Sequence, residues 1–191
     1  MPKIFIISDT HFNHANVIPY CDRPFKDVAE MNEELIRRWN EVVAPCDIVY
    51  HCGDFILGDP KTIYDILPRL NGKIILTRGN HDSKAKRAIY AEFPDKIQVS
   101  DIEYLEFGGL FFIFCHFPIT NEEFIKMVKE DNSEVVIIHG HVHEKTPFEE
   151  DPEAHIYNVS ADAIGFTPMP INLIHALVKK DFVEKGVWKG E

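Results

Sequence analysis

Cysteine pairs and long apolar runs are both missing from this sequence. Its four cysteines, Cys21, Cys46, Cys52 and Cys115, form no Cys-x-x-Cys spacing, which excludes a zinc ribbon and a dithiol redox motif. We expect Cys52 and Cys115, which lie in strand-like runs, to be small buried hydrophobes. No apolar stretch approaches the ~20 residues that span a bilayer, and the chain opens without a signal-peptide pattern. We therefore expect a soluble cytoplasmic protein with reduced thiols.

Basic residues are scarce as well. The chain has 20 Lys and Arg against 31 Asp and Glu, so its formal net charge is −11. A negative chain argues against broad binding to nucleic acid, which needs a basic face. It does not exclude a site for an anionic substrate, because bound divalent metals invert the local potential. The length of 191 residues is ordinary for a globular protein, and we expect one domain over residues 1–191.

Strand-like and helix-like segments alternate along the chain, which predicts an α/β fold. Apolar runs predict strands over residues 3–8, 47–51, 73–77 and 135–138, a hairpin of 102–107 and 110–115, and tail strands near 156–159 and 171–177. Helical spacing of apolar residues or a capping residue predicts helices over 27–44, 60–70, 83–92 and 121–130. The acidic stretch 149–151, flanked by prolines, is interpreted as a surface loop.

Residue types that bind metals follow five of these apolar runs. The five clusters are Asp9-Thr10-His11, Gly53-Asp54, Gly79-Asn80-His81-Asp82, Cys115-His116 and Gly140-His141-Val142-His143. A lone histidine after a strand, or a lone Gly-Asp turn, is most often structural. Five such clusters in order indicate a functional site instead, because ligands bind beyond the strand ends of an α/β sheet. The pattern predicts one cleft that holds a metal.

The mixture of side chains indicates the kind of metal. Asp9 and His11 are two residues apart, so on an extended strand end both point to the same side and can grip one cation. The two oxygens of a carboxylate such as Asp54 can bridge two metals, and Asn80 offers a neutral amide oxygen. Carboxylate, amide and imidazole ligands together suit Mn, Fe, Zn or Ni better than Ca²⁺ or Mg²⁺, and we favour Mn²⁺.

The ordered clusters resemble the calcineurin-like metallophosphoesterase superfamily. The resemblance runs from residue 3 to at least residue 143, and the opening Ser8-Asp9-Thr10-His11-Phe12 is similar to that of compact prokaryotic and phage phosphoesterases. It implies an α/β fold with mixed sheets, arranged as a four-layer α/β/β/α sandwich. It also implies a dinuclear metal centre at the strand ends.

The resemblance also implies a role for each residue. One metal would be held by Asp9, His11, Asp54 and His143, and the second by Asp54, Asn80, His116 and His141, so that Asp54 would be the bridge. His81 is not needed as a ligand. In the family this position approaches the scissile ester, and here His81 would protonate the leaving oxygen or stabilise its charge.

The sequence departs from the protein Ser/Thr phosphatases of that superfamily. Their Gly-Asp-x-x-Asp-Arg-Gly motif is replaced here by a stretch in which the Arg is missing and the next carboxylate, Asp59, is displaced. This argues against a protein phosphatase. It also leaves two carboxylates, Asp59 and Asp82, as alternatives for orienting His81. Surface or capping roles are favoured over substrate contact for His14 and Arg23, and His51 is expected to be packed in a strand.

We therefore expect a metal-dependent phosphoesterase that hydrolyses a phosphomonoester or phosphodiester of a small molecule, with nucleotides among the candidates. A nuclease is an alternative, but the chain shows no basic stripe. A non-catalytic scaffold with a phosphoesterase-like fold is a second alternative. Such a scaffold would be expected to have lost catalytic residues, whereas His81 and every expected ligand are present here.

Overall fold

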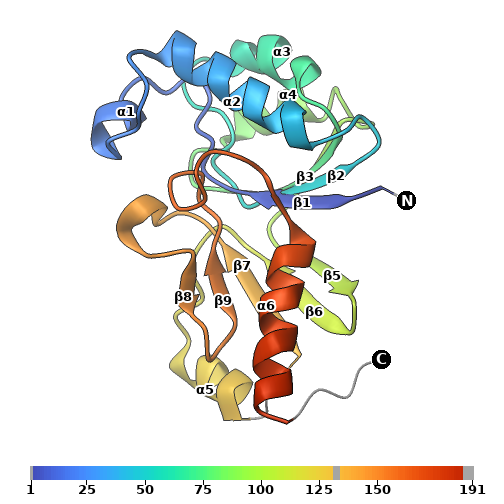
Figure 1. Ribbon diagram of the computed structural model, residues 1–191. Coiled ribbons are helices and arrows are strands. Elements are labelled where there is room, and N and C mark those ends of the chain that lie inside the picture. Colours follow the sequence, from blue (N-terminus) through green and yellow to red (C-terminus); the bar gives the residue numbers. More distant parts are fainter. Residues whose placement is uncertain (1, 131–133, 187–191) are drawn as a thin grey trace.

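The computed structural model describes residues 2–130 and 134–186, in which two five-stranded sheets lie face to face (Figure 1). The first sheet has the order β10-β1-β2-β3-β4. Its strands are β1 (Ile4–Ile7), β2 (Ile48–His51), β3 (Lys73–Thr77), β4 (Ile97–Ser100) and β10 (Met169–Pro170). Strands β1 to β4 run parallel, and β10 joins β1 antiparallel.

The second sheet has the order β5-β6-β7-β9-β8. Its strands are β5 (Glu103–Phe107), β6 (Leu110–Phe114), β7 (Val135–His139), β8 (Glu149–Asp151) and β9 (Ile156–Asn158). The predicted hairpin is present, with Phe107 paired to Leu110 across the turn. Strands β6, β7 and β9 are parallel, while β5 and β8 are antiparallel edge strands, so both sheets are mixed as expected.

Helices α2 (Val28–Val42), α3 (Ile63–Ile66) and α4 (Lys84–Tyr90) cover the outer face of the first sheet (Figure 1). Helix α2 begins at Asp27, whose side chain accepts a hydrogen bond from the backbone N–H of Glu30. Its apolar residues Met31, Leu35 and Trp39 recur at helical spacing and are buried against the sheet. This layer supplies one half of the hydrophobic core.

The second half of the core lies between the two sheets. Tyr50 of β2 stacks on Phe114 of β6 with ring centroids 4.3 Å apart, so side chains from both sheets interdigitate. Helix α6 (Ile171–Glu184) packs into this cluster, and α5 (Glu122–Glu130) covers the second sheet through Val128. The layers confirm the predicted α/β/β/α sandwich.

Three local predictions are wrong or incomplete. Residues 171–177, predicted as a strand, belong to α6, because Ile171, Ile174, Val178 and Phe182 follow helical spacing and are all buried. The acidic stretch 149–151 forms edge strand β8 instead of a loop. Strand β4, four residues at the edge of the sheet, was not predicted, although its apolar and polar side chains alternate as they do in a half-buried strand.

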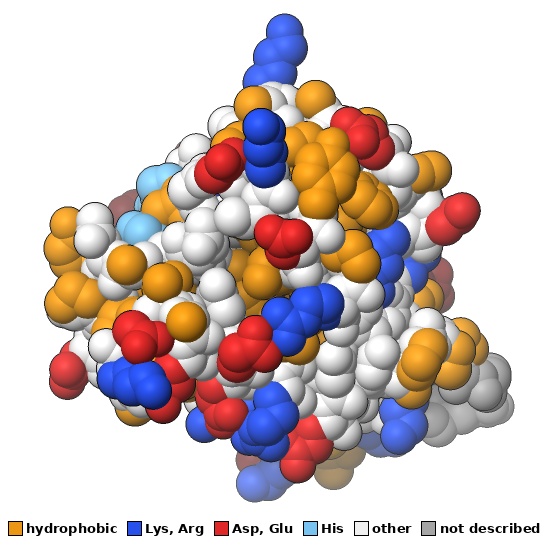
Figure 2. All heavy atoms as spheres, turned by 90° about the horizontal axis from the view of Figure 1, so that it is seen from above, with side chains coloured by type: hydrophobic (Ala, Val, Ile, Leu, Met, Phe, Trp, Pro, Cys, Tyr) orange, Lys and Arg blue, Asp and Glu red, His pale blue; other side chains and the backbone are white. Residues whose placement is uncertain are grey.

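Both charge signs are spread over the surface, and the two cysteines expected to be buried are buried. Figure 2 looks down onto the helices of the first sheet, where Lys and Arg are interspersed with Asp and Glu and the histidines gather at one edge. Cys52 and Cys115 are buried. Among the described residues no helix is both long and apolar enough to span a bilayer.

Candidate metal centre

The five polar clusters meet where the two sheets meet. Strands β1, β2 and β3 of the first sheet lead into Asp9, Asp54 and Asn80, while β6 and β7 of the second sheet lead into His116 and His141. The ligand types therefore come from the carboxyl ends of strands in two sheets rather than from one sheet edge. All seven predicted ligands gather in one cluster.

Five of these residues have a left-handed backbone conformation. The φ angles are 53° at Asp9, 50° at His11, 55° at Asp54, 72° at His141 and 52° at His143. A non-glycine residue pays about 1–3 kcal/mol for such a conformation, which persists only where the surroundings enforce it. Strain concentrated on the candidate ligands indicates that their side-chain directions serve a function.

The first group of ligand atoms surrounds Asp9. Its Oδ1 lies 3.8 Å from Nε2 of His11 and 3.8 Å from Nε2 of His143. Oδ2 of Asp54 lies 3.7 Å from the same nitrogen of His11. Burial and neighbouring positive charges hold the pKa of His11 far below its ordinary value, so its ring is neutral and able to donate a lone pair to a cation.

The second group of ligand atoms surrounds Asn80. Its Oδ1 lies 2.9 Å from Nε2 of His116 and 3.1 Å from Nδ1 of His141, and these two ring nitrogens are 3.2 Å apart. Nδ1 of His116 donates to the carbonyl of Cys52 at 2.8 Å, so Nε2 is the ring nitrogen that can offer a lone pair to a cation. A cation satisfies this convergence of acceptor atoms.

Asp54 belongs to both groups. Its Oδ2 lies 3.7 Å from Nε2 of His11 and 3.5 Å from Nε2 of His116. Its Oδ1 is engaged elsewhere, accepting a hydrogen bond of 2.8 Å from the backbone N–H of His81. Burial raises the pKa of Asp54, although nearby His116 opposes the rise. The two groups thus share one buried carboxylate oxygen.

The residues present fit bound cations. Ligand atoms about 2.0–2.2 Å from one metal lie roughly 3–4 Å from one another, which is the spacing found here. Oδ1 of Asp9 and Nε2 of His11 are buried without any hydrogen-bond partner among the described residues. Buried polar atoms are almost always satisfied. Asp9, His11 and His143 form one cluster able to hold a metal ion, and Asp9, Asp54 and His116 form another.

A buried ion pair orients His143. Nδ1 of His143 lies 2.7 Å from Oδ2 of Asp162, and both oxygens of Asp162 accept hydrogen bonds of 2.8 Å from Arg23. Burial lowers the pKa of His143, but its hydrogen bond to Asp162 and the charges of Asp9 and Asp162 outweigh burial, and the pKa is raised. Arg23 also donates to the backbone carbonyls of Asp9 and Thr10. Its role is to position the ligand loop.

Two hydrogen bonds to Oδ2 fix the orientation of the Asp9 carboxylate. Oδ2 of Asp9 accepts hydrogen bonds from Oγ of Ser160 at 3.0 Å and from the backbone N–H of His141 at 2.9 Å. A side chain at Gly140 would collide with both Ser8 and this oxygen, which explains glycine at that position. The carboxylate therefore cannot rotate, and Oδ1 stays directed at the two histidines.

Neither candidate carboxylate orients His81. Oδ2 of Asp82 accepts from the backbone N–H groups of Asp54 and Gly79, and Asp59 caps the turn that follows it. Within the described residues the His81 ring donates no hydrogen bond to either carboxylate. The His81 side chain is 42% exposed, and its Nε2 lies 3.9 Å from Oδ2 of Asp54. His81 is thus the accessible imidazole beside the shared oxygen.

Two cavities adjoin the cluster and have no lining residue in common. One, of about 560 Å³, is lined in part by His11, His14, His81 and His143. The other, of about 610 Å³, is lined in part by Asn80 and His116. Burial lowers the pKa of His14 to about 4, so this ring is neutral at pH 7. Each group of ligand atoms therefore opens into a cavity of its own.

Sequence reasoning missed Ser160 and Asp162, which support the ligands from behind. Both follow the predicted strand near 156–159, so the rule that found the five clusters would have found a sixth. Two histidines outside the cluster have structural partners. His51 is buried and hydrogen bonds to Thr10, and His155 pairs with Asp181.

Two facing mixed sheets, with buried Asp and His clusters at their strand ends, define a metallophosphoesterase-type fold. The chain belongs to the calcineurin-like phosphoesterase superfamily, whose domain profile matches residues 2–161. An uncharacterised protein of Methanocaldococcus jannaschii is 39% identical over 193 residues, which cover 98% of this chain and 97% of that protein.

Solved structures agree with this assignment. A protein of unknown function from Aquifex aeolicus superposes with a TM-score of 0.69 at 26% identity, over 93% of this chain and 100% of that one. A structure described as a novel archaeal phosphodiesterase superposes with a TM-score of 0.52 at 25% identity, over 82% of each chain.

Proposed function

We propose that this protein is a metal-dependent phosphoesterase that hydrolyses a phosphodiester or phosphomonoester of a small molecule with the help of two divalent cations. The observation that carries the proposal is the position of Oδ2 of Asp54, which lies within 3.7 Å of His11 and 3.5 Å of His116. One buried carboxylate oxygen between two sets of ligand atoms is the arrangement that a dinuclear centre requires.

Each cation would have its own set of ligands. Asp9, His11, Asp54 and His143 would hold the first, and Asp54, Asn80, His116 and His141 would hold the second. When bound, such cations acidify water and neutralise the charge that builds on phosphoryl oxygens. We favour Mn²⁺ over Fe, Zn and Ni, because the set includes hard carboxylate and amide oxygens beside imidazole.

His81 would act on the leaving group. Its ring is accessible, lies beside the shared carboxylate and lines the 560 Å³ cavity. It is the exposed imidazole that has no place in either ligand set, so it is free to give a proton to the departing oxygen. The backbone N–H of His81 donates to Oδ1 of Asp54, which fixes the loop and hence the position of the ring.

The name of one structural neighbour, an archaeal phosphodiesterase, supports the inclusion of diesters. Intact ligand positions and an accessible His81 support an enzyme over a non-catalytic scaffold. The net charge of −11 supports a small phosphorylated molecule over nucleic acid as substrate.

The test is hydrolysis of p-nitrophenyl phosphate and bis-p-nitrophenyl phosphate with Mn²⁺, Ni²⁺, Zn²⁺ and Mg²⁺ in parallel. We expect nitrophenolate release with at least one transition metal, strongest with Mn²⁺, and its loss with a chelator. Asp54→Ala is the control for a contaminating phosphatase. A protein that carries two metal ions by elemental analysis and hydrolyses neither ester would contradict the proposal.

A further inference from the structure

The 610 Å³ cleft beside Asn80 and His116 has a cationic rim. Arg78, Lys84 and Arg87 contribute to its lining. Its two carboxylates are already engaged: Asp82 accepts backbone hydrogen bonds and Asp101 pairs with Arg78 at 3.0 Å. In a chain with a net charge of −11, a cleft with spare positive charge beside the ligand cluster calls for an anionic occupant.

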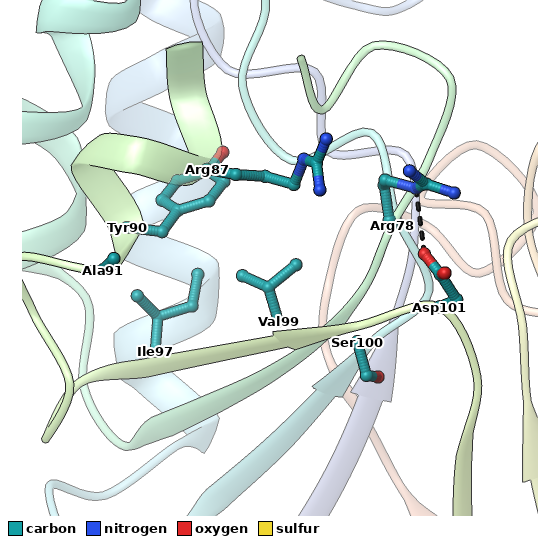
Figure 3. Close-up of a pocket in the computed structure, with 8 residues that line it drawn as sticks. All are labelled: Arg78, Arg87, Tyr90, Ala91, Ile97, Val99, Ser100 and Asp101. Atoms are coloured by element: carbon teal, nitrogen blue, oxygen red, sulfur yellow. Dashed lines mark ion pairs between the residues drawn. The ribbon is translucent and has the colours of Figure 1, made fainter. Parts of the chain in front are cut away.

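Arg87 supplies the spare charge. Its Nε is buried and has no hydrogen-bond partner. Asp101, which lines the same cleft, pairs with Arg78, and Arg87 itself forms no ion pair within the described part of the chain. Figure 3 shows Arg87 reaching from α4 toward Arg78. The hollow in that view, walled by Tyr90, Ile97 and Val99, is a second one, distinct from the 610 Å³ cleft, and Arg78 and Arg87 line both. The buried Nε–H is out of reach of a ligand, so an anion would pair with the two Nη groups of this half-buried guanidinium, which also form no hydrogen bond in the described part of the chain.

Part of the cleft lining is apolar and aromatic. Phe117 is 51% exposed and Ile102 is 47% exposed, although both are large apolar residues. The Phe117 ring rests against the rings of His116 and His141, with centroids 4.8 Å apart in each case. These contacts place Phe117 beside the candidate ligands, and its exposed surface can stack on a flat ring.

The two cavities can take the two substituents of a phosphodiester, one each. His81 lines the 560 Å³ cavity and not the cleft of Arg87, so the leaving group would enter the cavity of His81. The cleft that begins at Asn80 and His116 is then left for the other substituent of the phosphorus. A phosphomonoester has no such substituent and would leave this cleft empty.

We propose that the cleft binds the retained substituent of a phosphodiester, and that it selects a substituent bearing a flat ring system and a second anionic group. Phe117 and Ile102 would contact the ring, and Arg87 would pair with the anion. This rests on the proposed phosphoesterase activity and narrows its substrate class. A nucleotidyl group with a second phosphate has this chemistry.

A matched pair of esters tests the selection. The probes are the p-nitrophenyl ester of thymidine 5′-phosphate and the same ester carrying a 3′-phosphate. They share the leaving group and differ only in the second anion. We expect kcat/KM for the 3′-phosphorylated ester to exceed that of its partner at least tenfold, through a lower KM.

Arg87→Gln should lower this ratio of kcat/KM at least tenfold, and Arg87→Lys should retain part of it. Arg37→Gln, on the exposed face of α2, is the matched control and should preserve the ratio. Thermal melts and metal content show whether each variant folds. A ratio near one in the wild-type protein, or a ratio unchanged by Arg87→Gln, would overturn the assignment of the cleft.

A binding experiment tests the proposed selectivity of the cleft independently of hydrolysis. Calorimetry with Mn²⁺-loaded protein compares thymidine 3′,5′-bisphosphate with thymidine 5′-phosphate. If no ester is hydrolysed, the proposed function fails; a preference for the bisphosphate that Arg87→Gln removes would still support the cleft. Equal affinity for both nucleotides would refute it.

Discussion

Oδ2 of Asp162 lies 2.7 Å from Nδ1 of His143 and thereby fixes which ring nitrogen of His143 faces Asp9. The carboxylate is itself clamped by Arg23 through two hydrogen bonds of 2.8 Å. A carboxylate behind a ligating histidine sets the tautomer and raises the basicity of the other nitrogen. The strength of the first candidate metal site therefore depends on a residue outside it.

Replacing Asp162 with Asn should weaken one metal site selectively. Loss of such a supporting contact typically costs 10–100-fold in metal affinity. We expect that loss at the site of Asp9, His11 and His143, with the site of Asn80 and His116 little changed. Chelator competition followed by elemental analysis measures both. Asp181→Asn, which disturbs the pair with His155, is the control; equal weakening of both sites would argue against this role.

Replacing Asp54 with Ala should remove both metals. Its Oδ2 is the atom shared by the two groups of ligand atoms, so its loss opens both at once. We expect two ions per chain in the wild-type protein saturated with Mn²⁺, fewer than one in Asp54→Ala, and a milder deficit in His141→Ala. Elemental analysis decides, and a single tight ion in saturated wild-type protein would contradict the dinuclear centre.

His81→Ala should keep both metals and lose turnover. General acid catalysis is worth ~10²–10⁴-fold, so we expect a loss of that order for alkyl esters. The loss should shrink for nitrophenyl esters, whose leaving group needs little protonation. Rates for the two ester classes, measured beside metal content, test the role. Equal losses for both classes would rule out proton donation by His81.

The buried ring of His51 should make the metal-free protein less stable in acid. Burial, helped by the charge of His116, lowers the pKa of His51 to about 3. The unfolded chain, with a pKa near 6.5, then binds more protons than the folded one between these values, so stability falls as pH drops below about 6.5. At pH 5 the loss is on the order of 2 kcal/mol.

Urea unfolding of chelated protein at pH 7 and pH 5 measures this effect. His51→Gln cannot titrate but keeps a polar group near Oγ1 of Thr10, with which His51 hydrogen bonds. The variant should therefore show a smaller difference between the two pH values. An equal difference in both proteins would mean that other groups set the acid response.

The strand ends were predictable because local sequence determines them. Short apolar runs followed by Gly, Asp, Asn and His placed Asp9, Asp54 and His116 at the carboxyl ends of buried strands, and the structure brings these residues together. Helix α2 was equally readable from the helical spacing of its apolar residues. Each of these features rests on contacts within a few residues of sequence.

Features that depend on distant partners were not predictable. Arg23 was interpreted as a surface or capping residue, yet it is buried because Asp162, 139 residues away, neutralises it. Residues 171–177 form a short apolar run, which suits either a buried strand or a helix, and packing against both sheets selects the helix. The local pattern could not show which of the two sheets each ligand strand would join.

The division of the candidate ligands between two sheets has a consequence for the order of assembly. Asp9, Asp54 and Asn80 precede residue 81, whereas His116, His141 and His143 come later, and Asp162 braces the last of them. During synthesis neither proposed set of ligands is complete until the second sheet has begun to emerge: the second set needs His141, the first needs His143, and the supporting Asp162 comes later still. Cation binding would then require that the two sheets have already packed together. Each bound ion would in turn stabilise the packing, because its ligands come from both sheets.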